Sequence, residues 1–271
     1  MSHKSWPVFL IGCHRSGTTL VRYILDAHPR IACPPETKFI SALYQLTSYP
    51  QLVPGLLSLR MSYNDIFREF GACVQGIMDT YARKRSKIRW IDKTPNYYKL
   101  LPFIDDLFDH KVLFLFLIRH PLDNIISLGE QFTYISLGQI DKEIQDAIAH
   151  YGLGFQCWAK YWREVNETIL SFASLHPERA HLFRYEDLVH KPDKTVEHAL
   201  HFIDEEFYPD IVQNAFTMQH DRGYQDSKIN STQEIHGRSA GRWRQWNSAQ
   251  IESIWPIVAD LAQRLGYGIE T

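Results

Sequence analysis

The feature that most constrains this chain is an apolar segment that runs directly into a glycine-containing loop and then into an amphipathic segment. Residues 7–11 read PVFLI, residues 12–19 read GCHRSGTT, and LVRYILDAHP follows. This order predicts a buried strand, a tight turn and a helix whose free N–H groups face the turn. Gly12 and Gly17 have the spacing of a phosphate-binding loop, but Thr18 stands where such a loop carries lysine. The segment therefore predicts an anion site of an unusual kind.

Short apolar segments recur along the chain and are separated by helical patterns, which is typical of βαβ units. Strands are predicted at residues 7–11, 88–92, 111–118 and 180–185. Helices are predicted over residues 18–27, 96–108, 121–132, 143–175, 193–203 and 247–265. We therefore expect an α/β fold, a parallel sheet flanked by helices, whose strands end at one edge, where ligands of such sheets bind.

Two segments depart from this alternation. Residues 37–82 are mostly helical in pattern, and we expect them to form a helical insertion after the first βα unit, over the ligand edge. Residues 219–246 are rich in Gly, Arg, Ser, Asp and Gln and are too long for an ordinary connection, so an active-site loop is predicted there. The whole chain, residues 1–271, is expected to form a single domain.

The charge balance and the apolar segments exclude several classes of protein. With 29 basic and 31 acidic residues, the chain does not have the charge of a general nucleic-acid binder. No apolar stretch approaches the ~20 residues of a membrane span, and the first residues do not form a signal peptide. We expect a cytoplasmic protein, or a catalytic domain without its anchor. The four cysteines lack C-x-x-C spacing and are expected to be reduced core residues. The sequence leaves open whether the protein forms a homodimer.

Two further patterns bear on binding. His198 and His201 lie three residues apart on a predicted helix, but no third ligand has suitable spacing, so no metal site is expected. Residues 83–89 read RKRSKIR and predict either a solvated turn or a patch that attracts an acidic acceptor or partner.

The end of the third predicted strand bears on the anion. A magnesium-dependent kinase needs an acidic residue at the end of a neighbouring strand. Here the segment 111–118 is followed by Arg119. The loop is therefore expected to hold an anion without a terminal phosphate chain and its metal.

Residues 7–40 resemble the 5′-phosphosulfate-binding segment of sulfotransferases, closest to the tyrosylprotein sulfotransferase-like branch and its bacterial relatives. Three later segments resemble further motifs of that family in the same order: LIRHPLDNIISL (117–128), FRYEDLV (183–189) and SKINSTQEIHGRSAGRWRQW (227–246). The resemblance implies a sulfotransferase-like P-loop fold. It also implies 3′-phosphoadenosine 5′-phosphosulfate as co-substrate, a metal-free in-line transfer to an acceptor hydroxyl, and adenosine 3′,5′-bisphosphate as product.

The resemblance also implies the residues that bind the nucleotide. They are Arg15, Ser16, Gly17, Thr18, Thr19, Arg119, Ser127, Tyr185, Ser231, Arg238 and Arg242. Arg119 and Ser127 fit a phosphate on physical grounds as well, because Arg119 follows a buried strand and Ser127 lies two turns into the next helix. The alternative for Arg119 is a surface salt bridge with Asp123.

Four residues are expected to be catalytic by resemblance: Glu36, Lys93, Arg15 and Ser231. Glu36 follows two prolines and is the expected general base; its alternative is an ordinary glutamate favoured by a helix dipole. Lys93 follows the second predicted strand, where the family's lysine bonds the oxygen that bridges sulfur and phosphorus. Pro95 stands where many cytosolic sulfotransferases have a catalytic histidine, which supports Glu36 as the base.

Asp92 is expected either to bond Lys93 and hold it in position or to be only a charge at a turn. If Glu36 is not the general base, His120 and His236 are the next candidates. Two other function classes stay open: a P-loop small-molecule kinase, and a non-catalytic nucleotide-binding protein. The missing loop lysine speaks against the kinase, and the presence of both Glu36 and Lys93 speaks against the non-catalytic protein. The sequence does not specify the acceptor.

Overall fold

A computed structural model of the chain describes residues 6–132, 141–223, 229 and 233–269. Its centre is a five-stranded sheet in the order β2-β3-β1-β4-β5, with every pairing parallel. The strands are β1 (Val8–Gly12), β2 (Ile31–Ala32), β3 (Arg89–Lys93), β4 (Leu113–Ile118) and β5 (Ala180–Arg184). The predicted α/β fold with a parallel sheet is confirmed, and so are its four strands within two residues at each end. The two-residue strand β2 was missed because it is too short to show a pattern.

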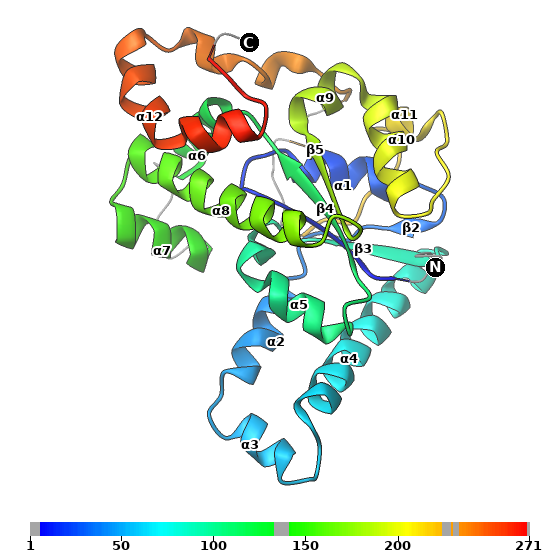
Figure 1. Cartoon of the computed structure of the whole chain (residues 1–271). Coiled ribbons are helices and arrows are strands. Elements are labelled where there is room, and N and C mark those ends of the chain that lie inside the picture. The colour runs from blue at the N-terminus through cyan, green and yellow to red at the C-terminus, as the bar shows by residue number, and fades with distance from the viewer. Residues whose placement is uncertain (1–5, 133–140, 224–228, 230–232, 270–271) are drawn as a thin grey trace.

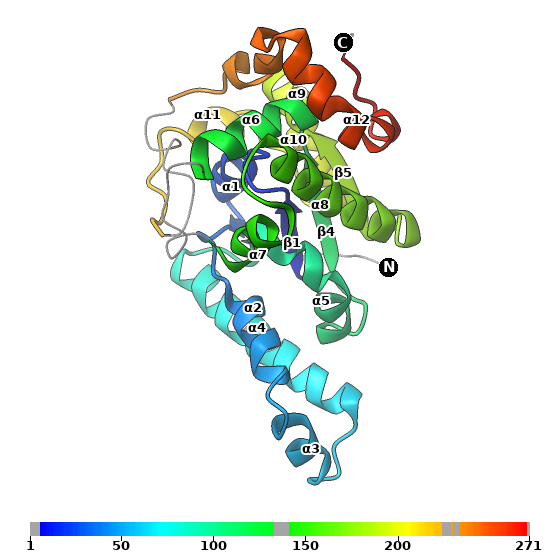
Figure 2. The ribbon, with the colours of Figure 1, turned by 90° about the vertical axis from the view of Figure 1, so that its left-hand side faces the viewer.

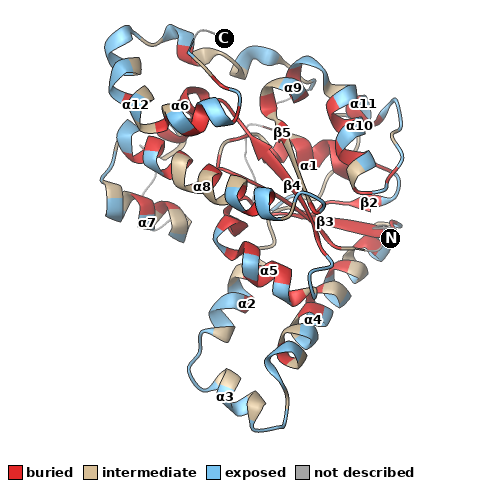
Figure 3. Ribbon diagram, viewed as in Figure 1, coloured by how far each residue is buried: buried red, intermediate tan, exposed pale blue. Residues whose placement is uncertain are grey.

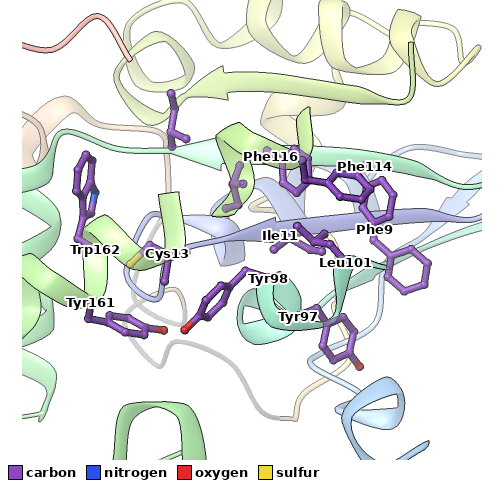
Figure 4. Close-up of a cluster of buried hydrophobic side chains, with 14 of the residues drawn as sticks. Phe9, Ile11, Cys13, Tyr97, Tyr98, Leu101, Phe114, Phe116, Tyr161 and Trp162 are labelled. Atoms are coloured by element: carbon purple, nitrogen blue, oxygen red, sulfur yellow. The ribbon is translucent and has the colours of Figure 1, made fainter. Parts of the chain in front are cut away.

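Helices cover both faces of the sheet, as Figure 1 shows. Phe9 and Ile11 of β1 point to one core and Val8 and Leu10 to the other, which is the alternation expected of a strand buried on both sides. The first core is closed by α5 (Leu101–Leu107), α6 (Pro121–Phe132), α8 (Phe155–Leu175) and α12 (Ser248–Arg264). The second is closed by α1 (Thr18–Asp26), α9 (Tyr185–His190), α10 (Pro192–Phe202) and α11 (Ile211–Asn214). Figure 4 shows part of the first core, in which aromatic side chains from strands and helices interlock.

The expected helical insertion is present. It consists of α2 (Phe39–Thr47), α3 (Leu52–Leu57) and α4 (Tyr63–Lys84) and extends away from the sheet (Figures 1 and 2). A capping box starts α4: the hydroxyl of Ser62 accepts from the amide of Asp65 at 3.1 Å, and the Asp65 carboxylate accepts from the amide of Ser62 at 2.9 Å. No residue of α3 is buried, and Figure 3 shows this outer end of the insertion coloured as intermediate and exposed. Its role over the ligand edge remains a prediction.

Two predicted helices differ from the structure, and the short helices α9 and α11 were not predicted. The long helix predicted over 143–175 is two helices, α7 (Lys142–Tyr151) and α8, because Gly152 and Gly154 adopt φ values of 78° and 133°. The helix predicted over 96–108 begins as a 3₁₀ helix, η1 (Pro95–Leu100), and continues as α5. The short α9 follows β5 directly and was missed. Further along the chain, η4 (Gly237–Ser239) and η5 (Arg242–Gln245) are also 3₁₀ turns.

All four cysteines are free thiols. Cys13, Cys33 and Cys157 are buried, as expected, whereas Cys73 is exposed on α4. The expectation that all four are core residues is therefore wrong for Cys73.

Candidate active site

The loop between β1 and α1 turns tightly at the carboxyl edge of the sheet. The amide of Ser16 donates to the carbonyl of Cys13 at 3.0 Å, and α1 begins directly after Gly17. Gly17 has φ 104°, and a Cβ on it would lie 2.6 Å from Cδ2 of Tyr185. Among the described residues, no side chain caps α1, so its first amides keep the donors that a helix start offers to an anion.

Buried donors without partners lie in this region. Ser16 Oγ and Arg119 Nε are buried and have no hydrogen-bond partner within the part of the chain that the structure describes. Native proteins seldom leave such groups unsatisfied. Thr18 and Thr19, also buried, add hydroxyl side chains in the first turn of α1. This region therefore offers hydroxyls, a guanidinium and the amides of a helix start as hydrogen-bond donors. Such donors suit a ligand that presents phosphate or sulfate oxygens.

Arg119 connects three of the residues assigned to the nucleotide. It is 4% exposed and follows the end of β4. Its guanidinium donates to the carbonyl of Arg15 at 2.8 Å and lies 4.6 Å from the centre of the Tyr185 ring. Arg15 Nε in turn donates to Ser127 Oγ at 3.3 Å. Burial lowers the pKa of the Arg119 guanidinium from its ordinary value. The structure therefore brings Arg15, Arg119, Ser127 and Tyr185 together.

The alternative for Arg119, a surface salt bridge with Asp123, is wrong. Asp123 is fully buried, and its carboxylate accepts from the amide of Gly241 at 2.6 Å and from that of Trp243 at 3.0 Å. Arg119 instead donates to backbone carbonyls, including that of Ser239. Asp123 therefore fastens residues 241–243 to the start of α6.

Glu36 and Lys93 meet at the same edge of the sheet. Lys93 ends β3 and lies opposite Leu10 of β1 in the register, two residues before the anion-binding loop begins at Gly12. Its side chain is 0% exposed, and its Nζ donates to Oε1 of Glu36 at 2.7 Å. Glu36 lies in the turn between β2 and α2, and its side chain is 12% exposed. Because a buried ammonium is costly without a partner, this carboxylate stabilises Lys93 in the folded protein.

Asp92 does not hold Lys93, so that expectation is wrong. Its two carboxylate oxygens accept from the hydroxyls of Thr37 and Thr94, each at 2.9 Å. Burial raises the pKa of Asp92 to about 6, although the hydroxyl donors and the charge of Lys93 act in the opposite direction. Asp92 is therefore a buried carboxylate that joins the end of β3 to the turn that carries Glu36.

Two arginines of the late loop, Arg238 and Arg242, were predicted to bind the phosphates of the nucleotide. Arg242 donates to Glu130 on α6 at 3.1 Å, and Arg238 is exposed. Among the described contacts, neither of these two arginine side chains reaches the anion-binding loop. Ser231 lies outside the described residues.

The reserve candidates for the base lie in other surroundings. His120 stacks on Trp243 with ring centres 5.0 Å apart, and its Nε2 lies 3.1 Å from the carbonyl of Gly268. Burial lowers the pKa of His120 from its ordinary value. His236 Nδ1 is buried and has no partner among the described residues. Within those residues there is also no group of three potential metal ligands, His198 and His201 included.

Sequence reasoning missed residues that support the site. Asn124 donates to the carbonyl of His14 at 2.8 Å, and Trp162 Nε1 donates to the carbonyl of Arg119 at 3.2 Å. Lys38, two residues after Glu36, forms an ion pair with Asp141 at the start of α7. Asn124 and Lys38 lie within quoted motifs, the segments 117–128 and 7–40, and those two positions could have been singled out.

The basic segment 83–89 is neither a fully solvated turn nor an open patch. Arg85 and Lys87 pair with the buried carboxylate of Asp26 at 3.3 and 3.5 Å. Arg89 is 5% exposed and pairs with Glu205 at 3.3 Å. Arg85, Lys87 and Arg89 therefore pair with acidic residues of the same chain. For these three residues, both predictions, a solvated turn and a patch for an acidic partner, are wrong.

A sequence profile described as "Sulfotransferase family" matches residues 7–210 of the chain. The chain belongs to the sulfotransferase family. It is 26% identical over 266 residues to the protein-tyrosine sulfotransferase of Drosophila melanogaster, an alignment that covers 95% of this chain and 50% of that protein. With nodulation protein NoeE of Sinorhizobium fredii it shares 24% identity over 283 residues, covering 96% of this chain and 65% of that protein. The chain thus spans half to two thirds of these relatives.

A solved structure supports the fold. The sulfotransferase domain of the Synechococcus PCC 7002 olefin synthase superposes with a TM-score of 0.69 at 22% identity, covering 99% of this chain and 97% of that domain. The predicted sulfotransferase-like fold is confirmed. Among the described residues, no helix is both long and apolar enough to cross a membrane.

Proposed function

We propose that this chain transfers the sulfuryl group of 3′-phosphoadenosine 5′-phosphosulfate to an acceptor hydroxyl without a metal ion. The observation that carries the proposal is the 2.7 Å contact between Glu36 and Lys93 beside the anion-binding loop. A carboxylate and an ammonium at this edge supply the two groups that sulfuryl transfer requires: a base for the acceptor and a cation for the leaving oxygen.

The donor is proposed to lie along the edge between the anion-binding loop and Arg119. Arg15, Ser16 and the first amides of α1, at Thr18 and Thr19, would hold the 5′-phosphosulfate. Arg119 and Ser127 would bind the 3′-phosphate, for which the buried Nε of Arg119 offers an unused donor. Ser231, Arg238 and Arg242 remain predicted nucleotide contacts of the late loop.

The transfer follows from these positions. Glu36 removes the proton of the acceptor hydroxyl, and the acceptor oxygen forms a bond to sulfur. The bond between sulfur and the bridging oxygen breaks, and the electron pair stays on the 5′-phosphate of adenosine 3′,5′-bisphosphate. Lys93 moves its hydrogen bond from Glu36 to that oxygen and neutralises the charge that develops there. Arg15 and Ser231 are predicted to assist at the sulfuryl group.

The two alternatives are less well supported. A P-loop kinase would need lysine at Thr18 and a free carboxylate for magnesium; the carboxylate of Asp92 is already bonded by two hydroxyls. A non-catalytic nucleotide-binding protein would not need a buried lysine bonded to a carboxylate beside the anion-binding loop. The family match agrees with the first proposal.

Ligand-induced stabilisation separates these functions. Adenosine 3′,5′-bisphosphate should raise the melting temperature in the presence of a chelator, because a ligand that binds only the folded chain stabilises it. ATP with magnesium should have little effect, whereas a kinase would show the reverse. Release of the bisphosphate from the donor in the presence of a phenol would then distinguish the enzyme from a binding protein.

The finer assignments remain predictions. We propose a cytoplasmic location, which the four free thiols suit. Three further predictions are still to be tested: pairing with a second copy of the chain, the absence of nucleic-acid partners, and the single-domain organisation.

A further inference from the structure

Two neighbouring residues of one turn contact two neighbouring residues of one strand. Glu36 accepts from Lys93 at 2.7 Å, and Thr37 Oγ1 donates to Asp92 Oδ2 at 2.9 Å. Successive side chains of a strand point to opposite faces of the sheet. The turn before α2 is therefore joined to the end of β3 through both faces of that strand, once by the proposed catalytic pair and once by Thr37 and Asp92.

The contact between Thr37 and Asp92 belongs to a closed network. The hydroxyl of Thr37 donates its proton to Asp92 and accepts from the amide of Phe39 at 3.2 Å. The second carboxylate oxygen of Asp92 accepts from Thr94 at 2.9 Å. Tyr97 lies beside this network, with its hydroxyl 3.4 Å from that of Thr37. Both hydroxyls bonded to Asp92 donate to it, so these two hydrogen bonds are complete when the carboxylate is ionised.

The proposed reaction makes this second contact necessary. When Lys93 turns to the leaving oxygen, the turn loses its bond through Glu36. We propose that Asp92 and Thr37 are positioning residues, a clamp that holds the turn, and with it Glu36, in place while Lys93 contacts the donor. This inference rests on the proposed function. Neither residue needs to touch the substrate, because a small displacement of a base is enough to slow a reaction.

The charge state of Asp92 gives the clamp a pH dependence. The groups that face this carboxylate are Thr37 and Glu36 from the turn, Lys93 and Thr94 at the strand end, and Tyr97 from η1. Burial raises the pKa of Asp92 to about 6. Protonated Asp92 has one acceptor fewer for the two hydroxyls, so the clamp should loosen as the pH falls through about 6.

The first test removes the hydroxyl of Thr37. In the Thr37→Val variant, adenosine 3′,5′-bisphosphate should speed hydrogen exchange at the amide of Ile40, which donates to Tyr97 Oη at 3.1 Å, because the nucleotide draws Lys93 away from Glu36. In the wild type and in Thr37→Ser the same ligand should leave the Ile40 amide protected. Thr80→Val, the same change at an exposed position of α4, is the matched control.

Turnover should follow the same pattern. With a phenol as the acceptor probe, we expect Thr37→Val to lower kcat at least about tenfold at unchanged KM for the donor. Thr37→Ser should restore kcat to within about threefold of the wild type, because the donor to Asp92 is present again.

The second test changes Asp92, and its two readouts should move in opposite directions. A buried carboxylate with a raised pKa costs stability once the pH exceeds that pKa, so Asp92→Asn should keep or raise the melting temperature at pH 7.5. The same variant should lower kcat at pH 7.5, and the ratio of wild-type to variant kcat should fall toward one as the pH drops through about 6. A residue that only supports the fold would lose stability and activity together.

Two results would overturn the clamp. One is a Thr37→Val variant whose Ile40 amide stays protected with nucleotide bound and whose kcat equals that of the wild type. The other is a ratio of wild-type to Asp92→Asn kcat that does not change between pH 7.5 and pH 5. If the wild type does not bind the bisphosphate, the proposed function is wrong, and the clamp inference fails with it.

Discussion

The guanidinium of Arg119 stacks on the ring of Tyr185, with its central carbon 4.6 Å from the ring centre. Arg119 follows β4 and Tyr185 begins α9, so two neighbouring strands of the sheet deliver the pair to the same edge. A stacked guanidinium is held in one orientation, which suits recognition of a phosphate.

This pair makes the choice of donor testable. Arg119→Lys keeps the charge but removes the planar fork, so the preference for 3′-phosphoadenosine 5′-phosphosulfate over adenosine 5′-phosphosulfate should fall about ten- to a hundredfold. The measurement is the ratio of kcat/KM for the two donors, with the exposed Arg264→Lys as control. Equal use of both donors by the unchanged protein would rule out a 3′-phosphate site at Arg119.

A second prediction concerns the backbone of the anion-binding loop. Gly17→Ala should lower both the melting temperature and the affinity for adenosine 3′,5′-bisphosphate, because φ is 104° and the new Cβ would lie 2.6 Å from Tyr185. Gly76→Ala is a matched control within α4, where a Cβ meets nothing within 4 Å. It should raise stability by about 0.5–1 kcal/mol. Unchanged nucleotide affinity in Gly17→Ala, measured by calorimetric titration, would speak against this loop as the binding site.

The buried carboxylate of Asp26 predicts how stability depends on pH. Burial alone would raise the pKa of Asp26, but the hydrogen bond from His220 and the charge of Lys87 outweigh burial and hold the pKa below 3.8. The stabilisation is therefore complete above pH ~4 and is lost as the pH falls through the lowered pKa. Asp26→Asn should lower the free energy of unfolding by about 3–5 kcal/mol at pH 7.

Urea unfolding of the wild type and Asp26→Asn at pH 7 and at acid pH checks this sign. The difference between the two proteins should shrink as the pH falls below ~4. A difference that grows on acidification would mean that Asp26 is not stabilised as an anion.

Local patterns in the sequence were sufficient for the strands and for most helices. The segment 111–118 could be read as a buried strand because it is continuously apolar, and its match, β4, is fully buried. The break between α7 and α8 was missed because the aromatic stripe of α8 obscured the two glycines that interrupt the helix. Glu36 and Lys93 were each given a catalytic role by resemblance to a family, and the structure brings them into contact.

The partners of buried polar groups could not be read from the sequence. Thr37 and Asp92 are 55 residues apart in the chain, and Gly241 and Asp123 are 118 apart. No periodicity links such positions, because their contacts depend on how the sheet edge and the late loop come together. The pairing of Asp92 with Lys93 and the alternative pairing of Asp123 with Arg119 were wrong for this reason: each carboxylate was assigned to a cation nearby in the sequence, whereas each accepts from a distant donor.

The central claim is that Glu36 is the base that removes the acceptor's proton. Glu36→Gln keeps the size of the side chain and its capacity to accept a hydrogen bond from Lys93, but it removes the basicity. General-base catalysis is typically worth 10²–10⁴-fold in rate. Because this contribution arises in the transition state, affinity for adenosine 3′,5′-bisphosphate should be almost unchanged.

The most direct measurement compares two acceptors in wild type and Glu36→Gln: an ordinary phenol, and a nitrophenol that is already ionised at the assay pH. Transfer to the phenol should fall 10²–10⁴-fold in the variant, whereas transfer to the ionised nitrophenol, which has no proton to lose, should fall far less. Near-normal transfer to the phenol by Glu36→Gln would contradict the account, most clearly if His120→Ala or His236→Ala abolished it.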